Sequence, residues 1–293
     1  MNYPPTRSIM RLLVDETQFS LVSEILSSAS KEIGRLNEPL LLLCLPTLSS
    51  SFSMAAIESS LVDNGVTYRR KFSIEEPDNS PWIKIIDDDS EKTSLETNPF
   101  RLTISTLVVD GLISHKGASR KGPLTSVAQA HALAQLISPN GHRIRRLRPW
   151  LISGNWINSA MDNTYDPLYS ALRDILLEEG IIKVVPIPEV PEPNVSEYEW
   201  IDENVLNAIS SRWISLDLEG KARVLSNLVR DSLIKSKPST SRLEEIVWHC
   251  VLAPGWSTDL AGQISSARLY WEENNSNIAS SKVIDKLIRD GVI

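Results

Sequence analysis

The segment from Leu40 to Phe72 constrains the fold of this chain more than any other part of its sequence. It begins with Leu40–Leu45, an unbroken apolar run that is typical of a strand covered on both faces in a parallel sheet. A hydroxyl-rich turn over Thr47–Ser51 follows, and then apolar residues at helical spacing lead to Gly65, which offers a left-handed helix cap. Val66–Phe72 has the composition of a second strand. The segment therefore predicts a strand, a helix and a parallel strand within an open α/β sheet.

The turn between the first strand and its helix is the place where such a sheet would bind a ligand. Ligands of open α/β sheets lie outside the carboxyl ends of the strands, and in this chain that place is Pro46–Ser53. The turn carries hydroxyl groups but no carboxylate, histidine or lysine. The sequence thus predicts a ligand position that lacks the groups an enzyme would need there.

Further strands and helices are expected as far as residue 186. Trp82–Ile86 is a short apolar strand that ends in the acidic cluster Asp87–Asp89, and Leu102–Val109 is the next strand. Leu124–Ile137 combines small and apolar residues as a tightly packed helix would, and Pro167–Gly180 begins and ends with residues that favour the two ends of a helix. Strands that alternate with helices favour a mainly parallel sheet with flanking helices.

A proline-rich stretch predicts the domain boundary. Four prolines fall between Pro186 and Pro193, which stiffens the chain into an extended spacer. We therefore expect an α/β domain over residues 1–186, a Pro/Glu-rich linker over 187–199 and a mainly helical domain over 200–293. The helices expected in that last domain are Glu203–Trp213, Glu219–Ile234, Ser241–Cys250, Thr258–Glu273 and Ser280–Asp290.

Composition narrows the class of protein. The chain has 293 residues, of which 42% are hydrophobic, so it can build a large core. No apolar run reaches the roughly 18 residues that cross a bilayer, and the N-terminus lacks the pattern of a secretory signal. The two cysteines, Cys44 and Cys250, lie in apolar stretches and are expected to be buried thiols. We therefore expect a cytoplasmic protein with no membrane contact.

Charge is unevenly distributed along the chain. The net charge is −7, yet residues 101–150 carry eight basic residues against the single acid Asp110, so that window is +7 and the remainder −14. Four of the basic residues, Arg143, Arg145, Arg146 and Arg148, precede Trp150. Arginines bind phosphates and an indole can stack on a base, so the cluster predicts contact with single-stranded nucleic acid or with an acidic protein partner. The sequence leaves these two alternatives open.

A second basic motif is Gly117–Gly122, which contains Arg120 and Lys121. It precedes a predicted helix, so its N–H groups would suit a phosphate, although a solvated loop is the simpler interpretation. Asp87–Asp89 is the acidic cluster expected at a strand end, where carboxylates are able to hold Mg²⁺ or Mn²⁺, and a solvated acidic turn is again the simpler interpretation. None of the four histidines has a second histidine or a cysteine at metal-ligand spacing.

The order of these features resembles the DHH phosphoesterase domain. The shared features are the buried strand, the turn into a small-residue helix, the second strand, the short strand ending in aspartate, and Val109-Asp110-Gly111 before a Gly/Ser-rich helix start. Within that superfamily the chain is most similar to RecJ-like proteins that serve as the non-MCM, non-GINS subunit of the replicative helicase complex. Arg212–Lys221, with the amphipathic helix that follows, is similar to a segment found after the phosphoesterase core of such proteins. The resemblance implies an α/β fold with a DHH-type sheet and a smaller helical C-terminal region.

The departures from the DHH pattern concern the metal ligands. Active members carry Asp-x-Asp-Gly after the first strand, where this chain has Thr47–Phe52, and no histidine occurs over Glu91–Val109, where Asp-His-His would stand. Of the ligands that would hold two Mn²⁺ ions, only an aspartate of Asp87–Asp89 remains, and a lone carboxylate cannot hold the pair. The resemblance therefore implies a pseudoenzyme with no catalytic residue, no bound metal and no cofactor.

Three functional hypotheses follow. The leading one is an inactive RecJ-like scaffold of the replication machinery that binds GINS-type or MCM-type helicase subunits and contacts single-stranded DNA. Its binding residues would be Arg120, Lys121, Arg143, Arg145, Arg146 and Arg148. The alternative is a divalent-metal-dependent phosphoesterase or single-strand nuclease with relocated ligands, Asp87–Asp89 and His115. The third is a stand-alone single-strand binder.

Overall fold

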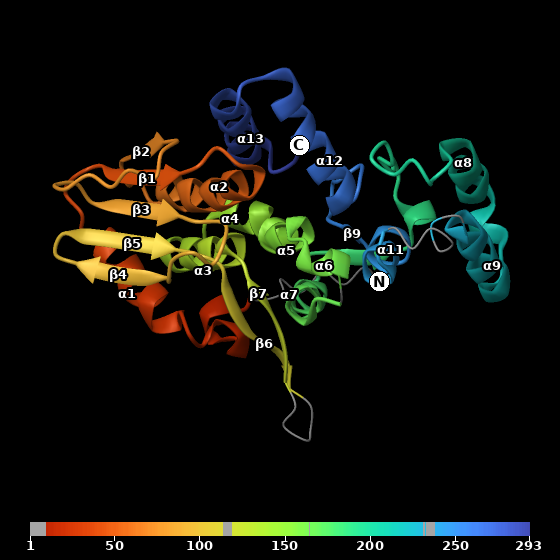
Figure 1. Ribbon diagram of the computed structural model, residues 1–293, viewed down its shortest axis with the longest axis horizontal. Helices are drawn as coiled ribbons and strands as arrows, with labels where there is room; N and C mark the ends of the chain where they lie inside the picture. The colour runs from red at the N-terminus through yellow and green to blue at the C-terminus, as the bar shows by residue number, and fades with distance from the viewer. Residues whose placement is uncertain (1–9, 114–118, 164, 231, 233–237) are drawn as a thin grey trace, which may run out of the picture.

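The computed structural model describes residues 10–113, 119–163, 165–230, 232 and 238–293. Its centre is a five-stranded sheet in the order β2-β1-β3-β5-β4, in which β4 runs antiparallel to β5 and the other neighbours are parallel. Helices pack around the sheet, as Figure 1 shows. The strands are β1 Leu40–Cys44, β2 Tyr68–Lys71, β3 Trp82–Ile85, β4 Ser94–Thr97 and β5 Phe100–Ile104. The expected α/β class with a mainly parallel sheet is confirmed.

The first two strands and the helix between them form as the sequence predicts. β1 lies between β2 and β3, and four of its five residues are fully buried, which explains its apolar composition. Helix α2, Leu48–Asp63, connects β1 to β2. Thr47 caps its first turn by accepting the Ser50 N–H at 3.0 Å, and Gly65 takes a φ of +68° just beyond its end.

Helix α2 is buried along most of its length because other helices pack on two sides of it. Helix α3, Ser126–Ile137, is its main neighbour, and α13, Ser276–Asp290, also packs against it. Serine and alanine predominate on α2, and their small side chains allow the helix axes to approach closely. Helix α1, Ser23–Ile33, packs against α3 and β4.

The strand predicted over Leu102–Val109 is wrong in its extent. The chain leaves the main sheet after Ile104, and a separate strand, β6 Leu107–Ile113, pairs with β7 Ser119–Leu124 as an antiparallel ribbon that projects from the domain (Figure 1). The break comes at Ser105 and Thr106, whose side chains and backbone bond outside the sheet. The Ser105 carbonyl accepts from Thr93 and Gln129, and the Thr106 N–H donates to the Asp88 carbonyl at 3.0 Å. Strand β4 was not predicted.

Short helices carry the chain from α3 to α7, which spans Pro167–Glu178. Pro167 occupies the first turn of α7, Asp166 caps that helix, and Gly180 follows it with a φ of +69°, as the sequence predicts. The elements between α3 and α7 are α4 His142–Leu147, the 3-10 helix η3 Arg148–Ile152, α5 Ser153–Ile157 and α6 Ala160–Asn163.

The C-terminal part is mainly helical, but it contains one strand that was not expected, β9 Cys250–Leu252. This strand pairs antiparallel with β8, Lys183–Val185. Cys250 therefore belongs to a strand, and the preceding helix ends at Val247. The helices are α8 Glu203–Arg212, α9 Leu218–Leu228, α11 Thr240–Val247, α12 Leu260–Glu273 and α13 Ser276–Asp290. Ile234, the predicted end of the second of these helices, lies outside the described residues.

The C-terminal helices return to the sheet domain. The Trp150 indole N–H donates to the Gly291 carbonyl at 2.9 Å, and the Trp271 indole N–H donates to the Pro46 carbonyl at 3.1 Å. In the proline-rich stretch, Ile187 and Val190 are buried, so this part of the chain packs against its surroundings. One hydrophobic core contains residues from both sides of the predicted linker at 187–199. The division into two domains there stays a prediction. None of the helices in the described ranges is long and apolar enough to cross a membrane.

Candidate functional site

A cleft of about 420 Å³ lies at the carboxyl ends of the parallel strands. It is the position at which an open α/β sheet binds its ligands. Asp87–Asp89 follow β3 and line the cleft, and Lys121 of β7 lines it as well. Thr106 and Val108, which follow β5, complete that part of the wall. The structure therefore brings the predicted acidic cluster and one of the predicted basic residues into a single cleft.

The carboxylate of Asp87 is held by hydroxyl groups. Ser50 donates to its Oδ1 at 2.9 Å and Ser126 donates to the same atom at 3.4 Å. Thr47 donates to its Oδ2. Three hydroxyls from two helix starts thus converge on one half-buried carboxylate.

The helices that supply these hydroxyls also favour a negative charge at this point. Asp87 contacts the first turns of both α2 and α3, where the helix dipoles are positive. The Asp87 carbonyl also accepts the Thr106 hydroxyl at 2.8 Å, which fixes its backbone. The charge of Asp87 is therefore stabilised by the protein itself, and we call this arrangement of Thr47, Ser50 and Ser126 around Asp87 the hydroxyl cradle.

Asp88 and Asp89 differ from Asp87 because both are exposed to solvent. Asp88 accepts the backbone N–H of Ser90 at 3.0 Å, and hydrogen bonds from the Ser90 side chain and backbone lower the pKa of Asp88. These contacts are typical of an acidic turn after a strand. They leave two exposed carboxyl groups at the mouth of the cleft.

The donor set does not fit the pair of Mn²⁺ ions that the DHH resemblance implies. In the part of the chain that the structure describes, no three His, Cys, Asp or Glu side chains lie together as metal ligands would. The side chains that face Asp87 are neutral hydroxyls, whereas two hard cations in one site need several bridging and terminal oxygen ligands of negative charge. His115, the relocated ligand of the hydrolase hypothesis, lies outside the described residues.

The C-terminal helices hold the turn that begins α2. The Ser51 hydroxyl donates to the Thr47 carbonyl at 2.6 Å and is hydrogen-bonded to the Ser280 hydroxyl of α13 at 2.9 Å. Trp271 of α12 donates to the Pro46 carbonyl in the same turn. The turn is thus fixed from outside the sheet as well as by Asp87.

The roles of Ser50 and Ser126 were not predicted from the sequence. A hydroxyl residue in the first turn of a helix that follows a strand is nevertheless a pattern that the sequence shows.

Arg148 is the clearest correction to the predicted binding residues. Its side chain is 1% exposed and forms a salt bridge to Glu179, which is equally buried. It also donates to Gln135 at 3.3 Å and to the Arg11 carbonyl at 3.1 Å. Because the guanidinium is enclosed, Arg148 is not available to a phosphate or to an acidic partner.

Two other arginines of the cluster also have partners within the fold. Arg143 pairs with Asp63 at the end of α2 at 2.5 Å, and Arg146 donates to the Ile288 carbonyl in the last turn of α13 at 2.6 Å. A cation at that place also complements the negative end of a helix dipole. Arg145 is exposed, and its guanidinium donates to the side-chain oxygen of Asn140 at 3.3 Å.

Arg120 and Lys121 lie in strand β7, which contradicts both interpretations of the Gly117–Gly122 motif over its described residues. Residues 119–122 pair with β6, with Lys121 opposite Asp110, so they form neither a solvated loop nor a phosphate loop. Gly117 lies outside the described residues. Both cationic side chains are exposed, and no salt bridge to them is found within the described ranges.

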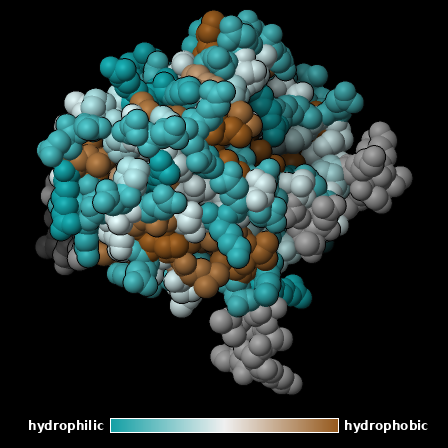
Figure 2. Space-filling model, turned by 60° about the vertical axis from the view of Figure 1, so that its left-hand side comes forward, coloured by the Kyte–Doolittle hydropathy of each residue, from teal (hydrophilic) through white to brown (hydrophobic). Residues whose placement is uncertain are grey.

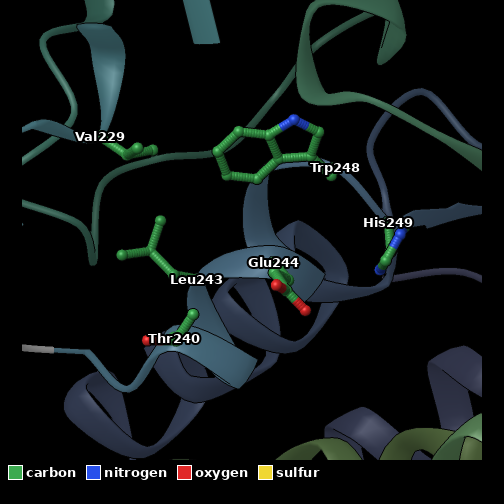
Figure 3. Close-up of a pocket in the computed structure, with 6 residues that line it drawn as sticks. All are labelled: Val229, Thr240, Leu243, Glu244, Trp248 and His249. Atoms are coloured by element: carbon green, nitrogen blue, oxygen red, sulfur yellow. The ribbon is translucent and has the colours of Figure 1, made fainter. Parts of the chain in front are cut away.

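A second cavity, of about 370 Å³, belongs to the C-terminal helices and is shown in Figure 3. Val229, Leu243 and Trp248 give it an apolar lining, and Glu244 and His249 lie on its α11 side. Its lining includes Thr240 at the start of α11, but no group of hydroxyls that converges on a carboxylate as the hydroxyl cradle does. We therefore treat the cleft at the sheet as the candidate site.

Neither a protein-family model nor a curated protein matches this chain.

Proposed function

We propose that this protein is a non-catalytic scaffold with a degenerate DHH-type domain, related to the RecJ-like subunit of the replicative helicase complex. The observation that carries the proposal is the hydroxyl cradle. At the place where an active DHH enzyme would bind metal, Thr47, Ser50 and Ser126 donate to Asp87. A carboxylate that is already bound by three donors at two helix starts serves to join α2, β3 and α3.

The proposed scaffold would bind protein partners of the replication machinery, of the GINS or MCM type. The acidic turn after β3 and the hydroxyl turn after β1 are among the features on which the DHH resemblance that suggested these partners depends. Of the six basic residues first considered for binding, Arg120, Lys121 and Arg145 remain exposed. They define the surface from which a contact with single-stranded DNA would have to be made.

Calorimetric titration with MnCl₂ tests the inactive part of the proposal. We expect no saturable heat from the purified chain, and no difference between the parent and Asp87→Ala. A saturable Mn²⁺ site that disappears in Asp87→Ala or Asp88→Ala would contradict it. Asp78→Ala, in an unrelated loop, is the matched control for the loss of one acidic side chain.

Purification of the tagged full-length chain from a native extract tests the partner part. We expect helicase subunits of the GINS or MCM type to be recovered in stoichiometric amounts and identified by mass spectrometry. Recovery of an unrelated complex, with none of these subunits, would reject the assignment to replication. The metal titration would then still decide the inactive part independently.

A metal-dependent phosphoesterase is the second candidate, because Asp87–Asp89 and Lys121 line the same cleft. A nuclease assay on a single-stranded oligonucleotide with Mn²⁺ distinguishes it. Cleavage by the purified chain that is lost in Asp88→Ala would support the enzyme, and absence of cleavage is the result we expect.

Binding of single-stranded DNA needs its own measurement. If the exposed cations contact phosphates, Arg120→Ala, Lys121→Ala and Arg145→Ala will each weaken binding uniformly across sequences and reduce the salt slope by about 1. Binding that is insensitive to all three variants would exclude these residues as the DNA surface.

A further inference from the structure

A groove of about 490 Å³ runs between the N-terminal turns and strand β6, and it shares Val108 and Lys121 with the acidic cleft. One wall is the 3-10 helix η2, Thr17–Phe19, with the Ser20 and Leu21 that follow it. The other wall is β6, with Lys121 of β7 beside it. Figure 2 shows apolar surface gathered just above the projecting ribbon.

Two large apolar side chains stand exposed at this groove, and the fold keeps them there. Leu21 is 67% exposed, because its neighbours Phe19 and Val22 occupy the core positions of the turn. Val108 is 58% exposed, because strand alternation directs Val109 inward. Neither side chain can reach the core without moving a buried neighbour outward.

The groove follows the free edge of β6. Four consecutive residues, 108–111, line it, and consecutive strand residues point to opposite faces, so the feature that they share is the backbone edge. In the described part of the chain β6 has one strand neighbour, β7. An open edge with apolar side chains beside it is a template for an added strand.

Charge indicates what kind of strand fits. Lys121 lines the groove and is exposed, with no salt bridge to it found among the described residues, whereas the neighbouring Arg120 points to the other face of the ribbon and is not part of the lining. Asp110 is the acidic residue of the groove lining. Among the described residues that line the groove, none has an aromatic side chain on which a nucleotide base would stack.

We propose that the groove between Thr17–Leu21 and β6 receives an extended, acidic and apolar segment of a protein partner, which adds to β6 as a third strand. Apolar residues of the segment would pack on Leu21 and Val108, and a carboxylate would pair with Lys121. The inference goes beyond the scaffold proposal, because it concerns the chemistry of docking and holds whichever complex the protein joins.

Fluorescence anisotropy with two synthetic peptides tests the proposal. The first repeats Asp-Val-Glu-Ile, and the second has lysine at every acidic position. We expect the acidic peptide to bind saturably and at least about tenfold more tightly than the basic one. Leu21→Asp and Lys121→Glu should each weaken the acidic peptide by about tenfold or more. Ile278→Asp changes a residue that is 46% exposed on α13 and should leave the affinity unchanged.

Amide hydrogen exchange then distinguishes strand addition from a contact between charges alone. Added protection over β6 when the acidic peptide is bound supports an added strand, whereas protection elsewhere rejects it. The proposal is also overturned by equal affinity for the two peptides, by no binding of the acidic peptide, by displacement of that peptide by a thymidine oligonucleotide, or by a dimer in sedimentation that Leu21→Asp dissociates. The unfolding midpoint of each variant shows whether it is folded.

Discussion

Replacing Arg148 by methionine should destabilise the protein strongly, because the fold uses this arginine as an internal cation. Arg148 and Glu179 are each 1% exposed and are joined by bonds of 2.8 and 3.2 Å. Arg148 also donates to Gln135 and to the Arg11 carbonyl. Truncating one partner of a buried ion pair costs about 3–5 kcal/mol, because the other charge stays in a medium of low polarity. We expect Arg148→Met to lie in that range.

The same island of sequence provides the matched control. Arg145 is three residues away and exposed, so Arg145→Ala should change the free energy of unfolding by less than about 0.5 kcal/mol. Urea unfolding followed by tryptophan fluorescence measures both variants. A third variant, Arg148→Met with Glu179→Leu, removes both charges and should recover much of the loss, since an apolar pair of similar volume is often as stable as a buried ion pair.

The outcome that would refute this reasoning is specific. If Arg148→Met unfolds at the parent's midpoint and instead weakens binding to single-stranded DNA, Arg148 acts at a surface and the buried ion pair is wrong. Equal destabilisation by Arg145→Ala would also refute it, because the argument depends on the difference in burial between the two arginines.

Three further outcomes follow from the structure. Burial, with a smaller contribution from Arg148, lowers the pKa of His131 to about 3, so the folded state resists protonation that the unfolded chain accepts below pH 6.5. Stability should fall as pH decreases from 6.5 toward 3, by up to about 5 kcal/mol, and His131→Gln should remove that slope in urea titrations. Burial raises the pKa of Asp259 to about 6, so the folded carboxyl keeps a proton that the unfolded chain loses above pH 3.8. The contribution of Asp259 to stability should decline by about 3 kcal/mol from pH 4 to 7, and Asp259→Asn, which retains the helix cap, should abolish the decline. A Cβ at Gly291, where φ is +77°, would lie 2.5 Å from Cγ of Arg146, so Gly291→Ala should lower the thermal midpoint more than Gly65→Ala, which shares the positive φ but meets no neighbour within 4 Å.

The sheet, α2 and the ends of α7 were predictable because their signals are local. Leu40–Cys44 is apolar at every position since both faces are covered, and Gly65 and Gly180 stand where a left-handed residue ends a helix. The ribbon of β6 and β7 was not predictable in this way. Ser105 and Thr106 are compatible with a strand, and only their bonds to Asp88, Thr93 and Gln129 show that the chain turns away there.

The burial of Arg148 could not be read from the charge or from the helical spacing. Arg145 and Arg148 are three residues apart, a spacing that brings two residues of a helix to neighbouring positions, yet the first is exposed and the second is buried. The chain passes from α4 into the 3-10 helix η3 at Arg148, and the groups that enclose its guanidinium, on Glu179, Gln135 and Arg11, come from other segments. A count of positive charges treats the two arginines alike, and only the fold separates them.

His131 shows a limit of the same kind on packing predictions. It is 2% exposed, as a packing residue in a helix of small side chains would be. Neither of its ring nitrogens has a hydrogen-bond partner among the described residues. Local sequence predicts that a side chain in a small-residue helix is buried, but the partners of a buried polar atom come from distant segments.

The two charge clusters that suggested chemistry share one physical property, which bears on where binding should be sought. In each cluster the fold holds particular charges by its own contacts: Asp87 by the hydroxyl cradle, and Arg148 by Glu179. A charge that is already paired inside the protein has lost most of the free energy it could give to a ligand. The exposed side chains of Lys121 and Arg120 have no such partner among the described residues, so they can still give this free energy to a ligand. Lys121 lines both the acidic cleft and the groove along β6. The ribbon, rather than the sheet edge or the arginine cluster, is therefore where a partner gains most.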